Sequence, residues 1–349
     1  MKVGILMKVG IVGCGSIARF RHAPEYTECD GVEIAGYYDP NTERAQALAK
    51  DFGGRVYASF EDLIHDGSIQ AVSICSANIY HKDMTIQALK AGKHVLCEKP
   101  MATTADDAAE MVKVAGETGR LLMVGHNQRF HPAHQKAKQL LEQGCIGQIL
   151  SIDTHFSHQG PETWSADKGK NTWFFDKKIA ALGALGDLGI HKIDLLQWLG
   201  DDEISEVFAC VDTLDKRDAA GALISVEDNA RCTVRTRKKG ILGTVLVSWT
   251  CYGDEDNSTT IYGTKGTMEI FRNKDFALVL SYADGSKEYH QVGRMQTNTE
   301  QTNTGIINAF VQAILDNSAS PVSGADACKT LRVIEACFQS SAEGRRVSL

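Results

Sequence analysis

The chain has 349 residues, of which 43% are hydrophobic and 23% are charged, as in ordinary globular proteins. This length exceeds what one hydrophobic core usually holds, so we expect two domains. The formal net charge of -7 argues against a nucleic-acid surface, because phosphate binding needs clustered Lys and Arg. No run of about 18 apolar residues occurs, so no membrane-spanning helix is expected.

The ten cysteines are irregularly spaced and form no CxxC pair. This usage is typical of buried thiols in a reducing compartment rather than of a disulfide framework. The N-terminal apolar run leads into a glycine turn without a small-residue cleavage site, so we expect no signal peptide and a cytoplasmic protein. Residues 1–6 (MKVGIL) nearly repeat residues 7–12 (MKVGIV), and we hypothesise that Met7 is the natural start.

Short apolar segments alternate with helical patterns from Lys8 to Gly125. Strands are expected at 8–12, 32–38, 70–75, 93–97 and 121–125, and helices at 16–28, 41–51, 59–66, 81–92 and 104–118. Continuous apolar runs are typical of strands buried on both faces. The alternation therefore predicts an α/β domain over residues 1–125, with a parallel sheet between helices.

The pattern changes after Gly125. We expect a helix at 132–143, a strand at 148–157, a loose aromatic segment at 159–182 and a helix at 185–199. Further strands are expected at 204–213, 224–236, 241–251, 257–262, 267–271, 276–281 and 286–290, and helices at 304–316 and 324–343. Consecutive strands predict an α+β domain over residues 126–349, with an open, mostly antiparallel sheet covered by helices on one face. The open face must be covered, so we expect a homodimer or homotetramer.

A glycine turn joins the first expected strand to the first expected helix. It consists of Gly13, Cys14, Gly15, Ser16 and Ile17, with Ala18 behind it. The first glycine permits a tight turn, the second lets the backbone approach a pyrophosphate, and the N–H groups at the helix start bind its charge. Such a turn can also merely connect strand and helix, but its context favours the Rossmann fingerprint for dinucleotides.

Asp39 ends the second expected strand, 21 residues after Ala18. A carboxylate at this place accepts hydrogen bonds from the ribose hydroxyls and repels a 2′-phosphate. No Arg follows immediately, although Arg44 lies within reach of such a phosphate. We therefore expect NAD as cofactor, with NADP less favoured.

Glu98-Lys99-Pro100 follows the fifth expected strand. Proline at a strand end fixes a sharp turn, with a cis bond as one option. Such a turn aims Lys99 out of the carboxyl end of the sheet, where ligands bind in open α/β folds. A lone motif of this kind would otherwise be a surface lysine on a turn.

Taken together, the motifs resemble those of the glucose–fructose oxidoreductase/inositol dehydrogenase/rhizopine-catabolism (Gfo/Idh/MocA) family over almost the whole chain. Besides the two turns above, they are Ser76-Ala77-Asn78 with His81, Asn127-Gln128-Arg129-Phe130, Asp187-Leu188-Gly189-Ile190-His191 and Tyr262-Gly263-Thr264-Lys265-Gly266. The resemblance implies a Rossmann domain, an open-sheet domain and an active site between them. It also implies the catalytic set Lys99, Asp187 and His191. The chain departs from the family pattern at Ser76-Ala77 and at the glycine pair Gly183 and Gly186.

The resemblance and the glycine turn together define two expected binding sets. The cofactor set adds to the five glycine-turn residues Asp39, Ser76, Ala77, Asn78, His81, Glu98, Lys99 and Asn127. The substrate set is Lys99, Arg129, Trp164, Trp173, Asp187 and His191. An aromatic ring beside polar groups suits a sugar face, but Trp164 and Trp173 could equally pack against the second sheet.

The helix expected at 185–199 carries a polar stripe on an otherwise apolar surface. Asp187, His191 and Asp194 are spaced i, i+4 and i+7, so they share one face. A polar stripe on a buried helix must be paired or must line a site. The residues alone leave a paired core histidine and a catalytic one equally open. The resemblance favours proton transfer by His191 and a structural role for Asp194.

No catalytic metal is expected. His155 and His158 are three apart on an expected strand, so they point to opposite faces, and no Cys or carboxylate set completes a site. We interpret the chain as an NAD(H)-dependent oxidoreductase acting on a secondary carbinol of a sugar, an inositol-like polyol or a glycoside. The alternatives are an NAD-retaining glycosidase that works by transient oxidation, and a non-catalytic dinucleotide-binding regulator.

Overall fold

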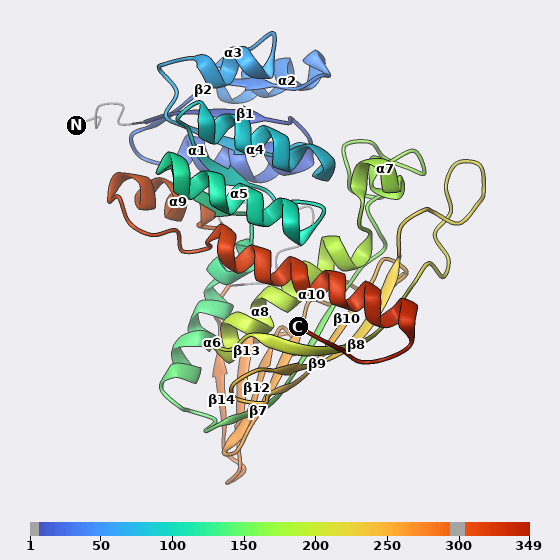
Figure 1. Cartoon of the computed structure of the whole chain (residues 1–349). Helices are drawn as coiled ribbons and strands as arrows, with labels where there is room; N and C mark the ends of the chain where they lie inside the picture. Colours follow the sequence, from blue (N-terminus) through green and yellow to red (C-terminus); the bar gives the residue numbers. More distant parts are fainter. Residues whose placement is uncertain (1–6, 294–303) are drawn as a thin grey trace.

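The computed structural model describes residues 7–293 and 304–349, so the first copy of the N-terminal repeat lies outside the described residues. The described part builds two sheets, of six and nine strands, with helices packed around the first and against one face of the second (Figure 1). The expected fold class is confirmed.

The first sheet is entirely parallel, with the order β3-β2-β1-β4-β5-β6. Its strands are β1 (Met7–Val12), β2 (Val32–Tyr38), β3 (Arg55–Val56), β4 (Ala71–Ile74), β5 (His94–Cys97) and β6 (Leu122–Val124). The inner strands β1 and β4 are apolar and almost fully buried, as expected for a sheet covered on both faces. The sequence did not predict β3, because two residues on a sheet edge leave no apolar run.

The helices of this half follow the expected segments. They are α1 (Ala23–Glu28), α2 (Thr42–Phe52), α3 (Phe60–His65), α4 (His81–Lys90) and α5 (Ala105–Thr118). The side chains of Asn41, Ser59 and Thr104 cap α2, α3 and α5 by accepting backbone N–H bonds. The first expected helix is divided, because a π-helical turn, η1 (Ala18–His22), precedes α1.

The second sheet has the order β14-β13-β12-β11-β7-β10-β9-β8-β15 and is antiparallel except between β7 and β10. Its strands are β7 (Ile149–Ser157), β8 (Ile204–Asp212), β9 (Asn229–Thr236), β10 (Leu242–Ser248), β11 (Thr259–Gly263), β12 (Gly266–Ile270), β13 (Leu278–Tyr282), β14 (Lys287–His290) and β15 (Val347–Ser348). β9 starts five residues later than expected. Just before β9, the carboxylate of buried Asp228 accepts the N–H groups of residues 214–216. These hydrogen bonds form a turn where strand pairing was expected.

The helices of the second half are α6 (Pro132–Glu142), α7 (Lys177–Ala180), α8 (Ile190–Gly200), α9 (Ile306–Leu315) and α10 (Gly324–Glu343). α8 packs on β7 and β10, and α10 packs on β8 and α8, so these helices lie on one face of the sheet (Figure 1). α9 contacts α1 and α10 contacts α5, which ties the end of the chain back to the first half. Within the described residues, no helix is both long enough and apolar enough to cross a bilayer.

Candidate active site

A cavity of about 700 Å³ lies at the carboxyl ends of β1, β4 and β5 and is closed by residues of the second half of the chain. The strand order reverses between β1 and β4, which is where ligands bind in open parallel sheets. Most of the expected site residues line it: Gly13, Gly15, Ser16, Ile17, Asp39, Ser76, Ala77, Asn78, His81, Glu98, Lys99, Asn127, Trp164, Trp173, Asp187 and His191. Its size suits a small-molecule site.

The glycine turn has the shape that a pyrophosphate requires. Gly13 has a φ of +87°, and a Cβ there would lie 2.5 Å from the backbone nitrogen of Ser76. A Cβ at Gly15 would meet nothing within 4 Å, so its backbone faces open space in the cavity. The turn therefore fits the dinucleotide that the fingerprint predicts. Cys14 does not line the cavity, which corrects its place in the expected cofactor set; it is buried, and its N–H donates to Asp39 at 2.7 Å.

Asp39 is fixed at the edge of the cavity by the backbone around it. Its Oδ2 accepts the Cys14 N–H, and its Oδ1 accepts the N–H of Asn41 at 2.8 Å. The carboxylate is thus oriented beside the glycine turn. This is the position from which an acidic residue binds the adenosine ribose hydroxyls of NAD.

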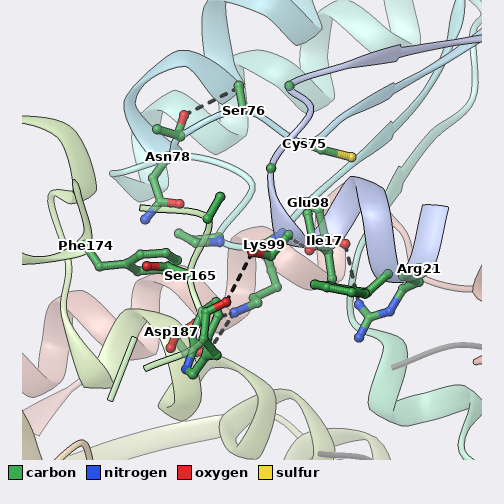
Figure 2. A pocket seen from close by; sticks show the side chains of 18 of the residues that line it. Ile17, Arg21, Cys75, Ser76, Asn78, Glu98, Lys99, Ser165, Phe174 and Asp187 are labelled. Carbon is green, nitrogen blue, oxygen red and sulfur yellow. Dashed lines mark hydrogen bonds and ion pairs between the residues drawn. The ribbon is translucent and has the colours of Figure 1, made fainter. Parts of the chain in front are cut away.

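Lys99 and Asp187 meet in the cavity although 88 positions separate them. The Lys99 Nζ donates to Asp187 Oδ1 at 2.6 Å and to the Asp187 carbonyl at 2.9 Å (Figure 2). The second carboxylate oxygen accepts the indole N–H of Trp249 at 3.3 Å. The peptide bond from Lys99 to Pro100 is cis. The two residues are held as one charged pair by groups from both halves of the chain.

The carboxylate of Glu98 stabilises the turn at Lys99. Its carboxylate is bonded to His22 at 2.9 Å and accepts the Lys99 N–H at 3.1 Å. It also lies 3.6 Å from Arg21 (Figure 2). Burial acts to raise the pKa of Glu98, but the bond to His22 and the neighbouring charges outweigh it and lower the pKa to about 2. Glu98 is therefore ionised although it is buried, and it holds the Lys99 turn next to Arg21 and His22.

His81 joins the two turns that border the cofactor side. Its Nδ1 lies 2.7 Å from the Pro100 carbonyl and its Nε2 lies 2.8 Å from the Ser76 carbonyl. Asn78 is engaged as well, because its amide donates to the Ala180 carbonyl at 2.8 Å. Both residues line the cavity mainly as structural supports.

His191 is the second residue of α8 and faces the same cavity. It is 6% exposed, and its Nδ1 has no hydrogen-bond partner. Burial, followed by the charge of Lys99, lowers the pKa of His191 well below its usual value. The ring is thus neutral near pH 7 and able to accept a proton.

The segment that carries the polar stripe is not α-helical throughout. Leu185–Gly189 form a π-helical turn, η5, and the α-helix begins at Ile190. This corrects the expectation of one α-helix over 185–199. Single π-helical turns inside helices occur often at functional sites, and here the turn carries Asp187 toward Lys99.

The aromatic segment both lines the cavity and packs against the second sheet. Trp164, Trp173 and Phe174 line the cavity. Trp173 stacks on Phe174 with ring centres 3.9 Å apart, and Trp164 lies 5.1 Å from Phe174. Phe174 also lies 6.5 Å from Trp249, which follows β10 of the second sheet. The tryptophans therefore form one cavity wall that is braced against the sheet.

The cavity also has lining residues that the expected site sets did not include, among them His158 and Glu255. His158 Nδ1 accepts the Gly160 N–H at 2.9 Å, so the neutral ring carries its proton on Nε2, which is buried and has no partner. Burial lowers the pKa of His158 to about 4 and raises that of Glu255 to about 7. Both residues lie just beyond strands, in loops without a recognisable motif. Only their proximity in the fold reveals them.

Arg129 is not brought to the cavity, which corrects the expectation that it contacts substrate. Its guanidinium donates to both oxygens of Asp194, at 2.8 and 2.6 Å, and both residues are buried. The pair joins η3 (Asn127–Phe130) to α8 and thereby positions the helix that carries His191. Asp194 is structural, as expected.

We expect Arg129→Ala to lower the free energy of unfolding by about 3–5 kcal/mol, because Asp194 would remain as a buried, unpaired charge. Denaturant unfolding measures the loss. Replacing both partners, as Arg129→Met with Asp194→Leu, should recover most of it. If the double variant regains its stability but has a raised KM, Arg129 would instead be assigned to substrate binding.

We expect the His191 ring to stay neutral as the pH is lowered from about 8 to about 6, because its pKa lies well below the usual value. Nitrogen NMR of histidine-labelled protein, with the signal assigned through His191→Asn, follows its protonation. Lys99→Met should raise the midpoint, since one positive neighbour is lost. A midpoint at about 6.5 in the native protein contradicts this account.

The chain is similar to known oxidoreductases over most of its length. The family model described as "Oxidoreductase family, NAD-binding Rossmann fold" matches residues 7–126, and the GFO/IDH/MocA C-terminal domain matches residues 134–269. An inositol 2-dehydrogenase/D-chiro-inositol 3-dehydrogenase of Shouchella clausii is 27% identical, covering 98% of this chain and 94% of that protein. A glucose-6-phosphate 3-dehydrogenase of Bacillus subtilis is 36% identical, but the match covers only 57% of this chain and 55% of that protein.

Among solved structures, a levoglucosan dehydrogenase in complex with NADH and levoglucosan has a TM-score of 0.84 and 26% identity. The match covers 98% of this chain and 99% of that one. The chain therefore belongs to the Gfo/Idh/MocA family of NAD-binding oxidoreductases.

Proposed function

We propose that the protein is a dehydrogenase or reductase that interconverts a secondary carbinol and a ketone of a sugar or polyol, with Lys99, Asp187 and His191 as catalytic residues. One observation carries this proposal: the Lys99–Asp187 pair and the neutral His191 line the same cavity as the glycine turn. Bound NAD supplies the hydride acceptor, or donor in the reverse direction. The protein must then accept the proton of the substrate hydroxyl and stabilise the charge on the substrate oxygen.

Each catalytic side chain has one task. The neutral His191 accepts the proton of the substrate hydroxyl as general base. The Lys99 ammonium donates a hydrogen bond to the same oxygen and stabilises the negative charge that develops there. Asp187 accepts hydrogen bonds from Lys99 and from Trp249, which fixes the direction of the ammonium.

The substrate wall combines an apolar surface with hydrogen-bonding groups. Trp173 and Phe174 supply a flat surface, His158 Nε2 supplies a buried donor, and Glu255 supplies an acceptor. This composition suits a ring that bears several hydroxyl groups. The similarity to an inositol dehydrogenase and to a levoglucosan dehydrogenase supports the same substrate class.

Lys99→Met should lower kcat by about 100-fold or more while leaving the Kd for NAD within a few-fold of the native value. An absorbance screen for NADH over inositols, hexoses, anhydrosugars and glycosides identifies the substrate on which to measure it. Lys82→Met is the matched control, because Lys82 pairs with Asp107 outside the cavity.

Unchanged turnover in Lys99→Met would remove the catalytic assignment. Release of a sugar from a glycoside without net NADH would instead identify an NAD-retaining glycosidase. Binding of NAD without turnover of any substrate would identify a regulator.

We propose that the protein assembles as a homodimer or homotetramer through the open face of the second sheet. Strand register places Phe208, Leu242 and Tyr262 on that face, and they are 44%, 50% and 41% exposed. Light scattering after size exclusion should give a molar mass of two or four times that of one chain. Leu242→Lys should lower this molar mass. A single chain mass for the native protein contradicts the proposal.

A further inference from the structure

A segment of the second half crosses the cavity on the adenosine side. This strap, residues 160–176, lies between β7 and α7. The Trp164 carbonyl accepts from the Ser16 hydroxyl of the glycine turn at 3.3 Å. Asp167 Oδ1 accepts from Arg44 Nη2 at 2.5 Å. Residues 164–167 all line the cavity, so the strap forms its wall beside the glycine turn.

The position of the strap is determined by its own bonds. The Ser165 hydroxyl bonds the Thr172 hydroxyl at 3.0 Å and the Asp167 carbonyl at 2.8 Å. At its base, Glu162 pairs with the buried Lys216. Asp167 is thus presented to Arg44 by a braced turn.

Arg44 lies in the first turn of α2, five residues after Asp39, and lines the same end of the cavity. An Arg at this position is the group that accommodates a 2′-phosphate in NADP-binding relatives of the fold. Here its guanidinium is bonded to Asp167. A 2′-phosphate would therefore approach two carboxylates, Asp39 and Asp167, and a cation already engaged.

We propose that Asp167, supplied by the second half of the chain, is a specificity-determining residue that excludes NADP by holding Arg44. This inference depends on binding of the adenosine ribose at Asp39 and not on which sugar is the substrate. Cofactor binding alone tests it, so its failure can be distinguished from failure of the catalytic assignment. The pair is about one-third exposed on each side, at 31% and 40%, and adds little to stability. Its removal should leave the fold intact.

The test is calorimetric binding of NAD and of NADP to the full chain, without substrate. Asp167→Ala should tighten NADP binding by about tenfold or more, because Arg44 becomes available for bidentate contact with the phosphate. The Kd for NAD should change by less than about threefold. Adding Arg44→Ala to Asp167→Ala should abolish the gain.

Asp51→Ala is the matched control, since it removes a similar exposed pair with Arg19, at 2.6 Å, outside the cavity. It should leave the Kd values of both cofactors unchanged. Unaltered NADP affinity in Asp167→Ala overturns the proposal, as does a gain that survives in the double variant. Equal weakening of NAD and NADP also overturns it, because Asp167 would then only hold the strap closed.

Discussion

The ion pair between Lys99 and Asp187 is the interaction on which the rest of the site depends. It joins the fifth strand of the parallel sheet to the π-helical turn before α8, across the boundary between the two halves. Removing a charged group from water is costly unless an opposite charge faces it. The pair therefore fixes the ammonium at the wall of the cavity. Burial, followed by the positive charge of Lys99, lowers the pKa of His191 well below its usual value, so this ring is neutral before it accepts a proton.

Contacts behind the cavity explain why the catalytic turn holds its shape. The Glu227 carboxylate accepts the N–H groups of Gly183 and Leu185, at 2.8 and 3.0 Å. A Cβ at Gly183 would lie 1.9 Å from the Glu227 carbonyl, and one at Gly186 would lie 2.3 Å from the Leu182 Cβ. The glycine pair noted in the sequence is thus required by close packing at the start of the turn rather than by contact with substrate.

Much of the fold and part of the site could be predicted from the sequence, because local patterns carried them. The apolar runs of β1 and β4 and the glycine turn each follow from neighbouring residues. The bond between Arg129 and Asp194 could not be predicted, because 65 positions separate partners whose types suit a substrate site equally well. His158 shows the same limit: its unpaired Nε2 becomes evident only when the loop and the cavity are seen together.

The charges of the cavity also bear on which ligands it accepts. Three Lys and Arg side chains line its described walls, and each has a carboxylate partner: Arg21 with Glu98, Arg44 with Asp167 and Lys99 with Asp187. Backbone N–H groups at the start of a helix bind a pyrophosphate, so this part of the cofactor needs no side-chain cation. A phosphate added to the ribose would have to displace Asp167 from Arg44. The arrangement therefore favours NAD, because its ribose places only neutral hydroxyl groups against Asp39.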